Sequence, residues 1–351
     1  MKARIIIASV VCCLTLHTNA QESWKLIWSD EFDYNGAPDN SKWSFDTEGN
    51  NWNWGNDEQQ NYTPEEMKNA WVENGNLIIE ARKESYRWYG DGETKNYTSA
   101  RLRTYRKADW CYCKIEVRAL LPQGKGMWPA IWLLPTDEVY GGWPQSGELD
   151  IMENVGFDPN RIHCNIHTEA YNHKNGTNKG NSVNVSLPYE NWHVYRIEWD
   201  EESVNYYVDD THVFTFQNEH RTWKEWPFDQ KFHLLLNIAV GGSWGGEQGI
   251  EDWRLPQRML VDYVRVYEKS GMSSIDDEIA NTVKVYPTLA EETISISGLT
   301  TSEQVQIISI NGNVIMEAKV DADDNTLNVD GLSQGKYLVR IGNATYPFLK
   351  K

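Results

Sequence analysis

The sequence has almost no helical pattern, and its tryptophans stop well before its end. Hardly any stretch of the 351 residues repeats apolar side chains with the 3.6-residue period of an amphipathic helix, which argues against helical and α/β folds. All seventeen tryptophans lie between Trp24 and Trp253, and no histidine follows His233. This loss of two residue types indicates a change of domain near residue 270.

Positive charge is also scarce. The chain has 33 lysines and arginines against 51 aspartates and glutamates, which gives a formal net charge of −18. A surface of this sign repels nucleic acid, so we expect no nucleic-acid partner. Strongly anionic substrates are mildly disfavoured as well, although solubility is the simpler reason for such acidity.

Long apolar runs are absent except at the N-terminus. Lys2 and Arg4 precede apolar residues from Ile5 to Leu16, and Thr18-Asn19-Ala20 follows, as in a secretory signal peptide. We assign residues 1–20 to this peptide, and its removal lowers the formal net charge from −18 to about −20. No later run approaches the length of a membrane span, so no span is expected.

Cysteine is rare, with five in the chain. Cys12 and Cys13 lie in the apolar run, where a lipoprotein anchor is the alternative, although the bulky residue before them disfavours it. Cys111 and Cys113 are two residues apart on an expected strand, too close to pair easily. We expect both to be reduced and Cys164 to be buried, while a bridge from Cys164 to either one stays open.

Strand-like runs recur between turn signals throughout residues 21–269. Their density predicts an all-β domain of two packed antiparallel sheets. The stretch Val208-Asp209-Asp210-Thr211-His212 suits a hairpin turn between two of the strands. The expected strands are Asn76–Ala81, Cys111–Leu121, Glu148–Glu153, Arg161–Thr168, His193–Asp200, Val204–Val208, His233–Val240 and Leu260–Tyr267.

A segment rich in glycine, serine and acids at residues 270–283 has the composition of a linker. Beyond it, residues 284–351 carry short alternating runs around Val305–Ile310 and Leu327–Ile341, with Asn311-Gly312 as a hairpin signal. We expect a small C-terminal β-sandwich that holds no catalytic cluster.

The stretch from Gly147 to Asn154 places three acids within six residues of an otherwise apolar strand. Because side chains alternate along a strand, Glu148 and Asp150 share a face, and Glu153 would point the other way. One extra residue, a β-bulge, would bring Glu153 onto the face of the other two. We therefore predict a bulge in which Met152 and Glu153 together oppose one residue of a neighbouring strand.

Three acids on one face suit the cleavage of a glycosidic bond, which needs a proton donor and a second carboxylate. On one bulged strand, Glu148 and Glu153 would lie about 5 Å apart, which predicts retention of configuration. Asp150 would hold a proton or hydrogen bond against Glu148, and Glu153 should keep its proton. The alternatives are a solvated face or a Ca²⁺ site, which the interleaved apolar residues disfavour.

Aromatic and histidine residues supply candidate contacts for a sugar, since pyranose rings stack on aromatic side chains. For each tryptophan a place in the core is at least as good an interpretation, but Trp244 stands in a glycine-rich loop that would expose it. His167 shares an alternation face with His163 and Asn165, so one of these could contact Glu153 or the leaving sugar. A structural role for each histidine is equally consistent with the sequence. Zn²⁺ binding is poorly supported. The tryptophan candidates are Trp52, Trp54, Trp128, Trp132, Trp143 and Trp244.

Over nearly all of residues 24–268 the chain resembles glycoside hydrolase family 16, and more narrowly its laminarinases, which are endo-β-1,3-glucanases. The resemblance implies a β-jelly-roll sandwich with a concave cleft, in which Glu148 is the nucleophile, Asp150 its assistant and Glu153 the acid/base. The bulged acid motif is similar to that of laminarinases and galactan hydrolases, whereas lichenases carry a shorter form. The matching stretches are Trp28-Ser29-Asp30-Glu31-Phe32, Trp54-Gly55-Asn56, Thr98-Ser99-Ala100-Arg101, Gly126-Met127-Trp128-Pro129-Ala130, Ser146–Glu153, His167–His173 and Val261–Tyr267.

The resemblance also implies binding residues and a function. No cofactor is implied for catalysis, but a structural Ca²⁺ is, at Glu31, Gly75 and Asp262. The expected substrate is the polysaccharide β-1,3-glucan, with mixed-linkage β-1,3/1,4-glucan as an extension. A sulfated-galactan hydrolase and a non-catalytic glucan-binding protein are the alternatives. The positions implied to line the cleft are Asn56, Arg101, Trp128, Trp132, Trp143, His167 and Trp244.

The tail resembles the C-terminal sorting domain of type IX secretion, through Val285-Tyr286-Pro287, Ile310-Asn311-Gly312 and Leu332–Tyr337. This resemblance implies a secreted or cell-surface protein that uses the type IX secretion machinery as a partner. A carbohydrate-binding sandwich is the alternative, which the lack of tryptophan in the tail disfavours.

Overall fold

The structure is a computed structural model, and it describes residues 23–88, 93–270, 283–299, 302–309, 313–321, 325–341 and 344–351. The predicted signal peptide, most of the predicted linker and the Asn311-Gly312 turn lie outside these residues. Trp24–Lys269 forms one compact unit, and Ser270–Lys351 belongs to another. In the described part of the chain, no helix is both long and apolar enough to cross a membrane.

Two sheets form the first unit, and in the larger one β8 and β14 alternate strictly between buried and part-exposed residues. In β8, for example, every second residue from Ile115 to Ala119 is fully buried. In spatial order this sheet runs β15 (Thr211–Gln217), β14 (Ser203–Val208), β13 (His193–Trp199), β8 (Lys114–Leu120), β17 (Gln257–Ser270), β5 (Asn76–Arg87), β6 (Thr94–Ser99) and β3 (Gln60–Tyr62), with β1 (Ser23–Asp30) on β17 and β4 (Ala70–Glu73) on β5.

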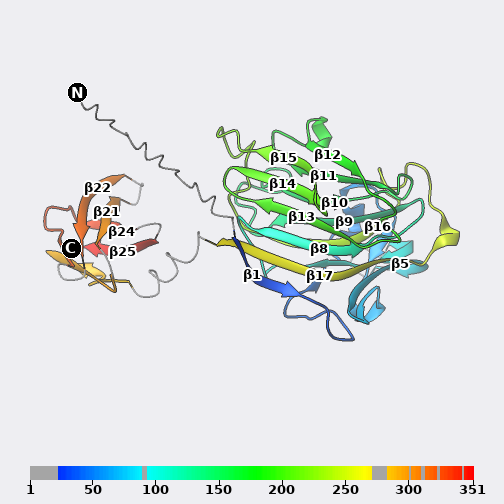
Figure 1. Ribbon diagram of the computed structural model, residues 1–351, viewed down its shortest axis with the longest axis horizontal. Helices are drawn as coiled ribbons and strands as arrows, with labels where there is room; N and C mark the ends of the chain where they lie inside the picture. Colours follow the sequence, from blue (N-terminus) through cyan, green and yellow to red (C-terminus); the bar gives the residue numbers. More distant parts are fainter. Residues whose placement is uncertain are drawn as a thin grey trace, which may run out of the picture. The chain divides into compact units, whose positions relative to one another are not determined.

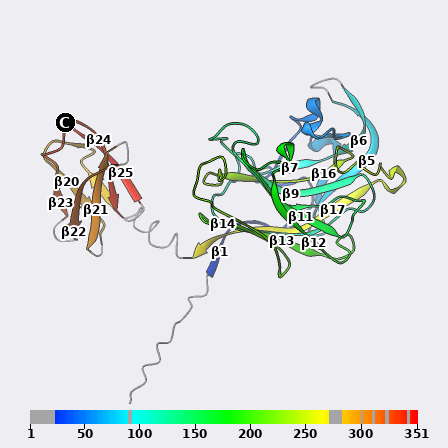
Figure 2. The same ribbon diagram turned by 90° about the horizontal axis from the view of Figure 1, so that it is seen from above.

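The smaller sheet lies across the larger one, and the two views of the ribbon show the layers packed face to face (Figures 1 and 2). Its central strand β16 is buried along its whole length. Leu234, Leu236 and Ile238 point into the core between the sheets, whereas His233 and Asn237 line a cleft on the other face. The order is β12 (Lys179–Asn184), β11 (Arg161–His167), β10 (Glu148–Glu153), β9 (Met127–Pro135), β16 (Phe232–Val240), β7 (Arg101–Arg103) and β2 (Ser44–Phe45).

Helical structure in the described residues is confined to single turns, in agreement with the missing helical period. These are the 3₁₀ segments η1 (Asn50–Gly55), η2 (Glu65–Met67), η3 (His173–Asn175) and η4 (Asp252–Arg254). In η1 the backbone departs from helical geometry at Trp52, Asn53 and Trp54. That irregular turn places tryptophans at the rim of the cleft.

The described residues of the second unit form two small sheets around their own core. Ile294, Ile296, Val305, Ile307 and Val339 are fully buried there. The first sheet is β18 (Lys284–Tyr286), β20 (Thr293–Ser297) and β23 (Thr326–Asn328). The second is β19 (Leu289–Ala290), β25 (Ala344–Lys350), β24 (Gly335–Ile341), β21 (Glu303–Ser309) and β22 (Val314–Val320).

All eight strands predicted for the first unit are present, so the all-β prediction is confirmed. The predicted hairpin is confirmed as well, because Val208 pairs with Thr211 across the turn between β14 and β15. Cys111, Cys113 and Cys164 are free thiols, and burial raises the pKa of each of them.

Candidate active site

A cleft of about 1030 Å³ lies on the outer face of the smaller sheet. Strands β7, β16, β9, β10 and β11 form its floor, and the loops around η1 and η3 contribute to its walls. Glu148, Asp150 and Glu153 all line it. The three predicted acids therefore share one cavity.

The bulge that this arrangement needs is present in β10, one residue earlier than predicted. Against β9, Asp150 pairs with Trp132 and Met152 with Ile131, so Ile151 is the extra residue. Against β11, Asp150 pairs with Asn165 and Glu153 with His163, so Ile151 and Met152 together oppose Cys164. The predicted pair, Met152 and Glu153, is thus wrong by one position.

Burial explains where the bulge falls. Ile151 and Met152 are both fully buried in the core between the sheets. A bulge at these residues lets two consecutive apolar side chains face the core, while a bulge one residue later would turn Met152 into the cleft. Glu153 reaches the cleft face in either case.

Gly147, the residue before β10, has a backbone conformation and close neighbours that exclude a side chain. Its φ of +89° lies in the region that L side chains rarely adopt, and a Cβ there would stand 2.8 Å from Pro227 and 2.9 Å from Phe228. Only glycine fits such a position without displacing its neighbours. The residue thereby sets the point at which Glu148 enters the cleft.

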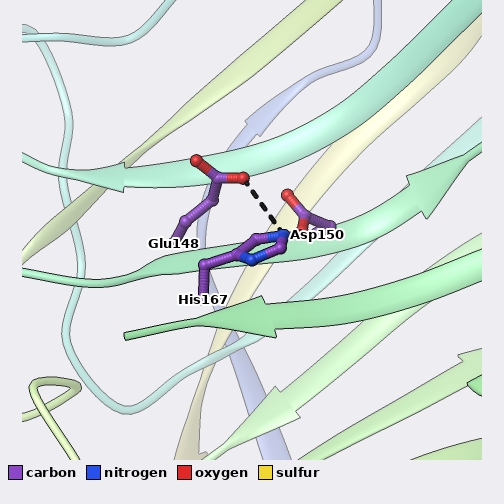
Figure 3. Close-up of side chains that lie close together, drawn as sticks. All are labelled: Glu148, Asp150 and His167. Atoms are coloured by element: carbon purple, nitrogen blue, oxygen red, sulfur yellow. Dashed lines mark ion pairs between the residues drawn. The ribbon is translucent and has the colours of Figure 1, made fainter. Parts of the chain in front are cut away.

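His167, on the neighbouring strand β11, faces the first two acids. Its Nε2 lies 3.7 Å from Glu148 Oε1 and 3.3 Å from Asp150 Oδ2. Figure 3 shows the imidazole and both carboxyl groups pointing toward one another from the two strands. Both carboxyl groups thus lie within 4 Å of one imidazole nitrogen, and the proton that Asp150 should hold against Glu148 stays a prediction.

Glu153 has a separate set of partners. Its carboxylate accepts hydrogen bonds from Trp128 Nε1 and from Asn165 Nδ2, each at 3.1 Å. The sequence pointed to His163, Asn165 or His167 as a contact of this acid, and Asn165 is the one that donates to it. His163 instead packs its ring edge-on against Trp244 at 5.0 Å.

Burial raises the pKa of each of the three carboxyl groups. The charge of Asp150 raises the pKa of Glu148 further, and His167 acts in the opposite direction. At Glu153 the effect of burial on the pKa is opposed by His167 and by the hydrogen bonds from Trp128 and Asn165. A raised pKa is therefore not confined to Glu153, for which the sequence predicted the proton, and in the free cleft it is strongest at Glu148 and Asp150.

The same residues raise the question of a metal. Ligand atoms of Glu148, Asp150 and His167 lie within 4.8 Å of one another, and among the described residues no other group of this kind occurs. Burial raises the pKa of both carboxyls, so a divalent ion bound there would have to displace their protons. The interpretation as a catalytic group accounts for their arrangement.

The two carboxylates implied for calcium each pair with an arginine. Glu31 forms an ion pair with Arg265 at 2.7 Å, and Asp262 forms one with Arg118 at 2.6 Å. Gly75 lies in the turn between β4 and β5. A Ca²⁺ ion there would need main-chain carbonyl ligands, and the site stays a prediction.

All seven residues predicted to bind substrate line the cleft, although their contact with sugar stays a prediction. Arg101 lies between two indole rings, 4.3 Å from the Trp54 centroid and 4.6 Å from that of Trp132. Trp128 packs edge-on against Trp244 at 5.4 Å. The seven are Asn56, Arg101, Trp128, Trp132, Trp143, His167 and Trp244.

Several other cleft residues were not predicted from the sequence. Glu58 and Asn237 lie in the cleft wall although both are buried, and His173 and Lys174 flank Trp143. Asn237 stands in a fully buried strand, where a polar residue is itself a signal of a functional position. Glu58 is only two residues from Asn56, but nothing in its local sequence indicates burial.

Comparison with known proteins agrees with this site. The model of the glycosyl hydrolases family 16 matches residues 39–265, and that of the secretion system C-terminal sorting domain matches residues 284–351. A protein named beta-glucanase from Rhodothermus marinus is 48% identical over 276 residues, which cover 76% of this chain and 94% of that protein.

Solved structures give the same result. The laminarinase from Rhodothermus marinus is 50% identical, with a TM-score of 0.67 over 71% of this chain and 98% of its own. The catalytic domain of an endo-1,3-beta-glucanase from Thermotoga petrophila is 40% identical, with a TM-score of 0.65 over 72% of this chain and 100% of its own. The acid motif, the cleft and these likenesses agree, and the chain belongs to the glycosyl hydrolases family 16.

Proposed function

We propose that this protein is a secreted, endo-acting, retaining hydrolase of β-1,3-glucan. The observation that carries the proposal is the β10 bulge, which places Glu148 and Glu153 on one face of one strand inside the cleft. Acids so placed favour the carboxyl separation of about 5 Å found in retaining enzymes. The cleft crosses five strands, which suits a polysaccharide bound along its length.

The reaction proceeds in two steps. Glu148 attacks the anomeric carbon while Glu153 gives its proton to the leaving oxygen, and the glycosidic C–O bond breaks. Glu153, now a carboxylate, takes a proton from water while the water oxygen attacks the anomeric carbon and the bond to Glu148 breaks. The new hydroxyl lies on the face that the leaving oxygen had occupied, opposite Glu148. Asp150 holds a proton against Glu148 until the nucleophile is needed.

The direct test is Glu148→Gln. We expect release of reducing ends from laminarin to fall by about 10³-fold or more, because the nucleophile is lost. Glu198→Gln, on β13 of the other sheet and paired with Arg196, is the matched control and should leave the rate unchanged. Circular dichroism should show both variants folded, and activity that survives in folded Glu148→Gln would refute the assignment.

Stereochemistry is tested independently. Proton NMR of early products should show the β-anomer of the new reducing end, because two inversions at one carbon restore its configuration. An initial α-anomer would indicate an inverting mechanism and a wider separation of Glu148 and Glu153.

The alternatives differ in substrate or in chemistry. A sulfated-galactan hydrolase would need unpaired cations for sulfate, but Arg101 and Arg103 both pair with Asp46. A non-catalytic glucan-binding protein does not need the three acids, and here all three remain in the cleft. Rates on laminarin, curdlan, lichenan, agarose and carrageenan distinguish β-1,3-glucan from mixed-linkage glucan and from galactans.

The sorting domain at residues 284–351 makes this a secreted or cell-surface protein. We further infer that the type IX machinery is its partner in export. Deletion of residues 284–351 should leave the protein in the periplasm of a type IX-competent host, and undiminished export would contradict the inference.

A further inference from the structure

Glu58 is a buried acid in the cleft wall that the proposed reaction does not use. Only 6% of its surface is exposed, although it lines the cleft. Its carboxylate accepts a hydrogen bond from Gln60 Nε2 at 2.6 Å and a longer one from Asn56 Nδ2 at 3.5 Å. A carboxyl group this deeply buried is costly, so its retention calls for an explanation.

A directed chain of hydrogen bonds leads from the cleft floor toward this carboxylate. Trp132 Nε1 donates to Asn237 Oδ1 at 2.7 Å, and Asn237 Nδ2 donates to the Tyr62 hydroxyl at 3.0 Å. The Tyr62 hydroxyl lies close enough to Glu58 for the charge of the carboxylate to raise the pKa of that hydroxyl. Each group donates in one direction along the chain, and an anion beside the last hydroxyl favours that direction for every member.

The other end of the chain is part of the cleft floor. Trp132 pairs directly with Asp150 across the two strands. Its indole also stacks on the Arg101 guanidinium, whose charge faces Glu58. Trp132 and Arg101 are therefore held between the catalytic strand and the buried acid.

The loop that carries Glu58 is itself held firmly. Glu58 forms an isolated antiparallel β-bridge with Gly241. Lys95 Nζ donates hydrogen bonds to the main-chain carbonyls of Glu58 at 3.3 Å and of Gln60 at 3.1 Å. The Gln60 amide, which donates to Glu58, accepts from the Val240 N–H at 2.7 Å. These contacts leave Glu58 no room to turn away from the cleft wall.

We propose that Glu58 is a positioning residue, whose carboxylate orients Asn56, Asn237 and Trp132 and so sets the affinity of the cleft for its glucan. The inference rests on the proposed function and adds a residue to it. Because Glu58 lies outside the reacting groups, it acts on binding and not on bond cleavage.

The test is Glu58→Gln in the full mature chain, with laminarin as the substrate. Glutamine has the same shape but presents an amide donor to Gln60, Asn56 or Tyr62, which breaks the chain. We expect KM to rise about tenfold while kcat stays within about threefold, the pattern of lost uniform binding. The same change in the Glu148→Gln background should weaken laminarin binding by a similar factor.

Glu80→Gln is the matched control. Glu80 is equally buried, at 5% exposure, and pairs with Arg82 and Arg258 away from the cleft. Its loss should lower the melting temperature and leave KM unchanged. An equal rise of KM in Glu80→Gln would assign the effect to general destabilisation and overturn the proposal.

Tyr62→Phe provides a second route, since it removes only the hydroxyl that links Asn237 to Glu58. We expect it to raise KM too, and the double variant to raise KM by less than the product of the single effects. An unchanged KM in folded Glu58→Gln, or in Tyr62→Phe should Glu58→Gln not fold, overturns the proposal. A wild type that does not hydrolyse laminarin would instead refute the proposed function.

Discussion

Three carboxyl groups share the cleft, and the His167 imidazole lowers the pKa of two of them. Burial raises the pKa of Glu148, Asp150 and Glu153, and the charge of His167 lowers the pKa of Glu148 and Glu153. The nucleophile must be ionised and the acid protonated at the same pH, so the balance between these effects sets the pH range of the enzyme. His167 is therefore important at the residue scale although it takes no part in bond making.

His167→Asn should move the pH profile of laminarin hydrolysis upward. Without the His167 side chain, the pKa values of Glu148 and Glu153 both rise, because burial is then less opposed. The nucleophile ionises at higher pH and the acid keeps its proton to higher pH. We expect both limbs of the kcat/KM profile to shift up by about one pH unit.

His173→Asn is the control for this prediction. The His173 ring packs against His167 at 5.1 Å, but its charge is not among those that act on Glu148. The profile of this variant should keep its limbs in place even if the rate falls. Limbs that stay in place or move toward lower pH in His167→Asn would contradict the prediction.

At the scale of the element, the bulge in β10 decides on which face of the strand each acid lies. Glu148 and Asp150 lie two residues apart, but Glu153 is three residues beyond Asp150, and a regular ladder would send it into the core. In the bulge, Ile151 and Met152 together oppose the single residue Cys164 of β11. The bulge therefore places two apolar side chains in the core and the third acid in the cleft.

Deletion of Met152 tests whether parity alone is required. The shortened stretch would read Glu-Leu-Asp-Ile-Glu, whose three acids alternate onto one face without a bulge. We expect this variant to cleave laminarin at a reduced rate and to lose about 2–5 kcal/mol of stability with the buried methionine. Thermal unfolding and reducing-end release measure the two effects.

Deletion of Leu149 is the contrasting variant. It puts Glu148 next to Asp150 in the sequence, so the two acids would face opposite sides of the strand and activity should be lost. Should the Met152 deletion be inactive while it stays folded, the bulge itself would be needed, beyond its effect on parity.

Which strands could be predicted from the sequence depends on how clearly apolar residues mark their buried faces. Strands buried on one or both faces, such as β8 and β16, could be predicted because their apolar pattern is strong. The edge strand β12 is mostly exposed and polar, so no apolar pattern marks it. The bulge was predicted from parity, but a bulge at Ile151–Met152 and one at Met152–Glu153 both satisfy parity, and the choice depends on the tertiary packing of Met152 in the core. Glu58 was missed for the same reason, since its partners are distant in sequence.

At the scale of the whole molecule, the described residues form two separate hydrophobic cores. The first core contains residues from Phe32 to Val266, and the second begins at Val283. All of the proposed catalytic and binding residues lie in the first unit, Trp24–Lys269. We therefore propose that residues 21–269 form a complete enzyme and that residues 284–351 serve export alone.

A chain of residues 21–269 should thus fold and hydrolyse laminarin with kcat/KM within about twofold of residues 21–351, because no residue of its core or cleft is removed. A chain that ends at residue 256 is the contrast. It lacks β17, which lies between β8 and β5 in the larger sheet, and the loss of a central strand exposes both neighbours. That shorter chain should not fold. Comparable loss of activity in both truncated chains would show that the second unit is needed for catalysis, and the division of labour between the two units would have to be abandoned.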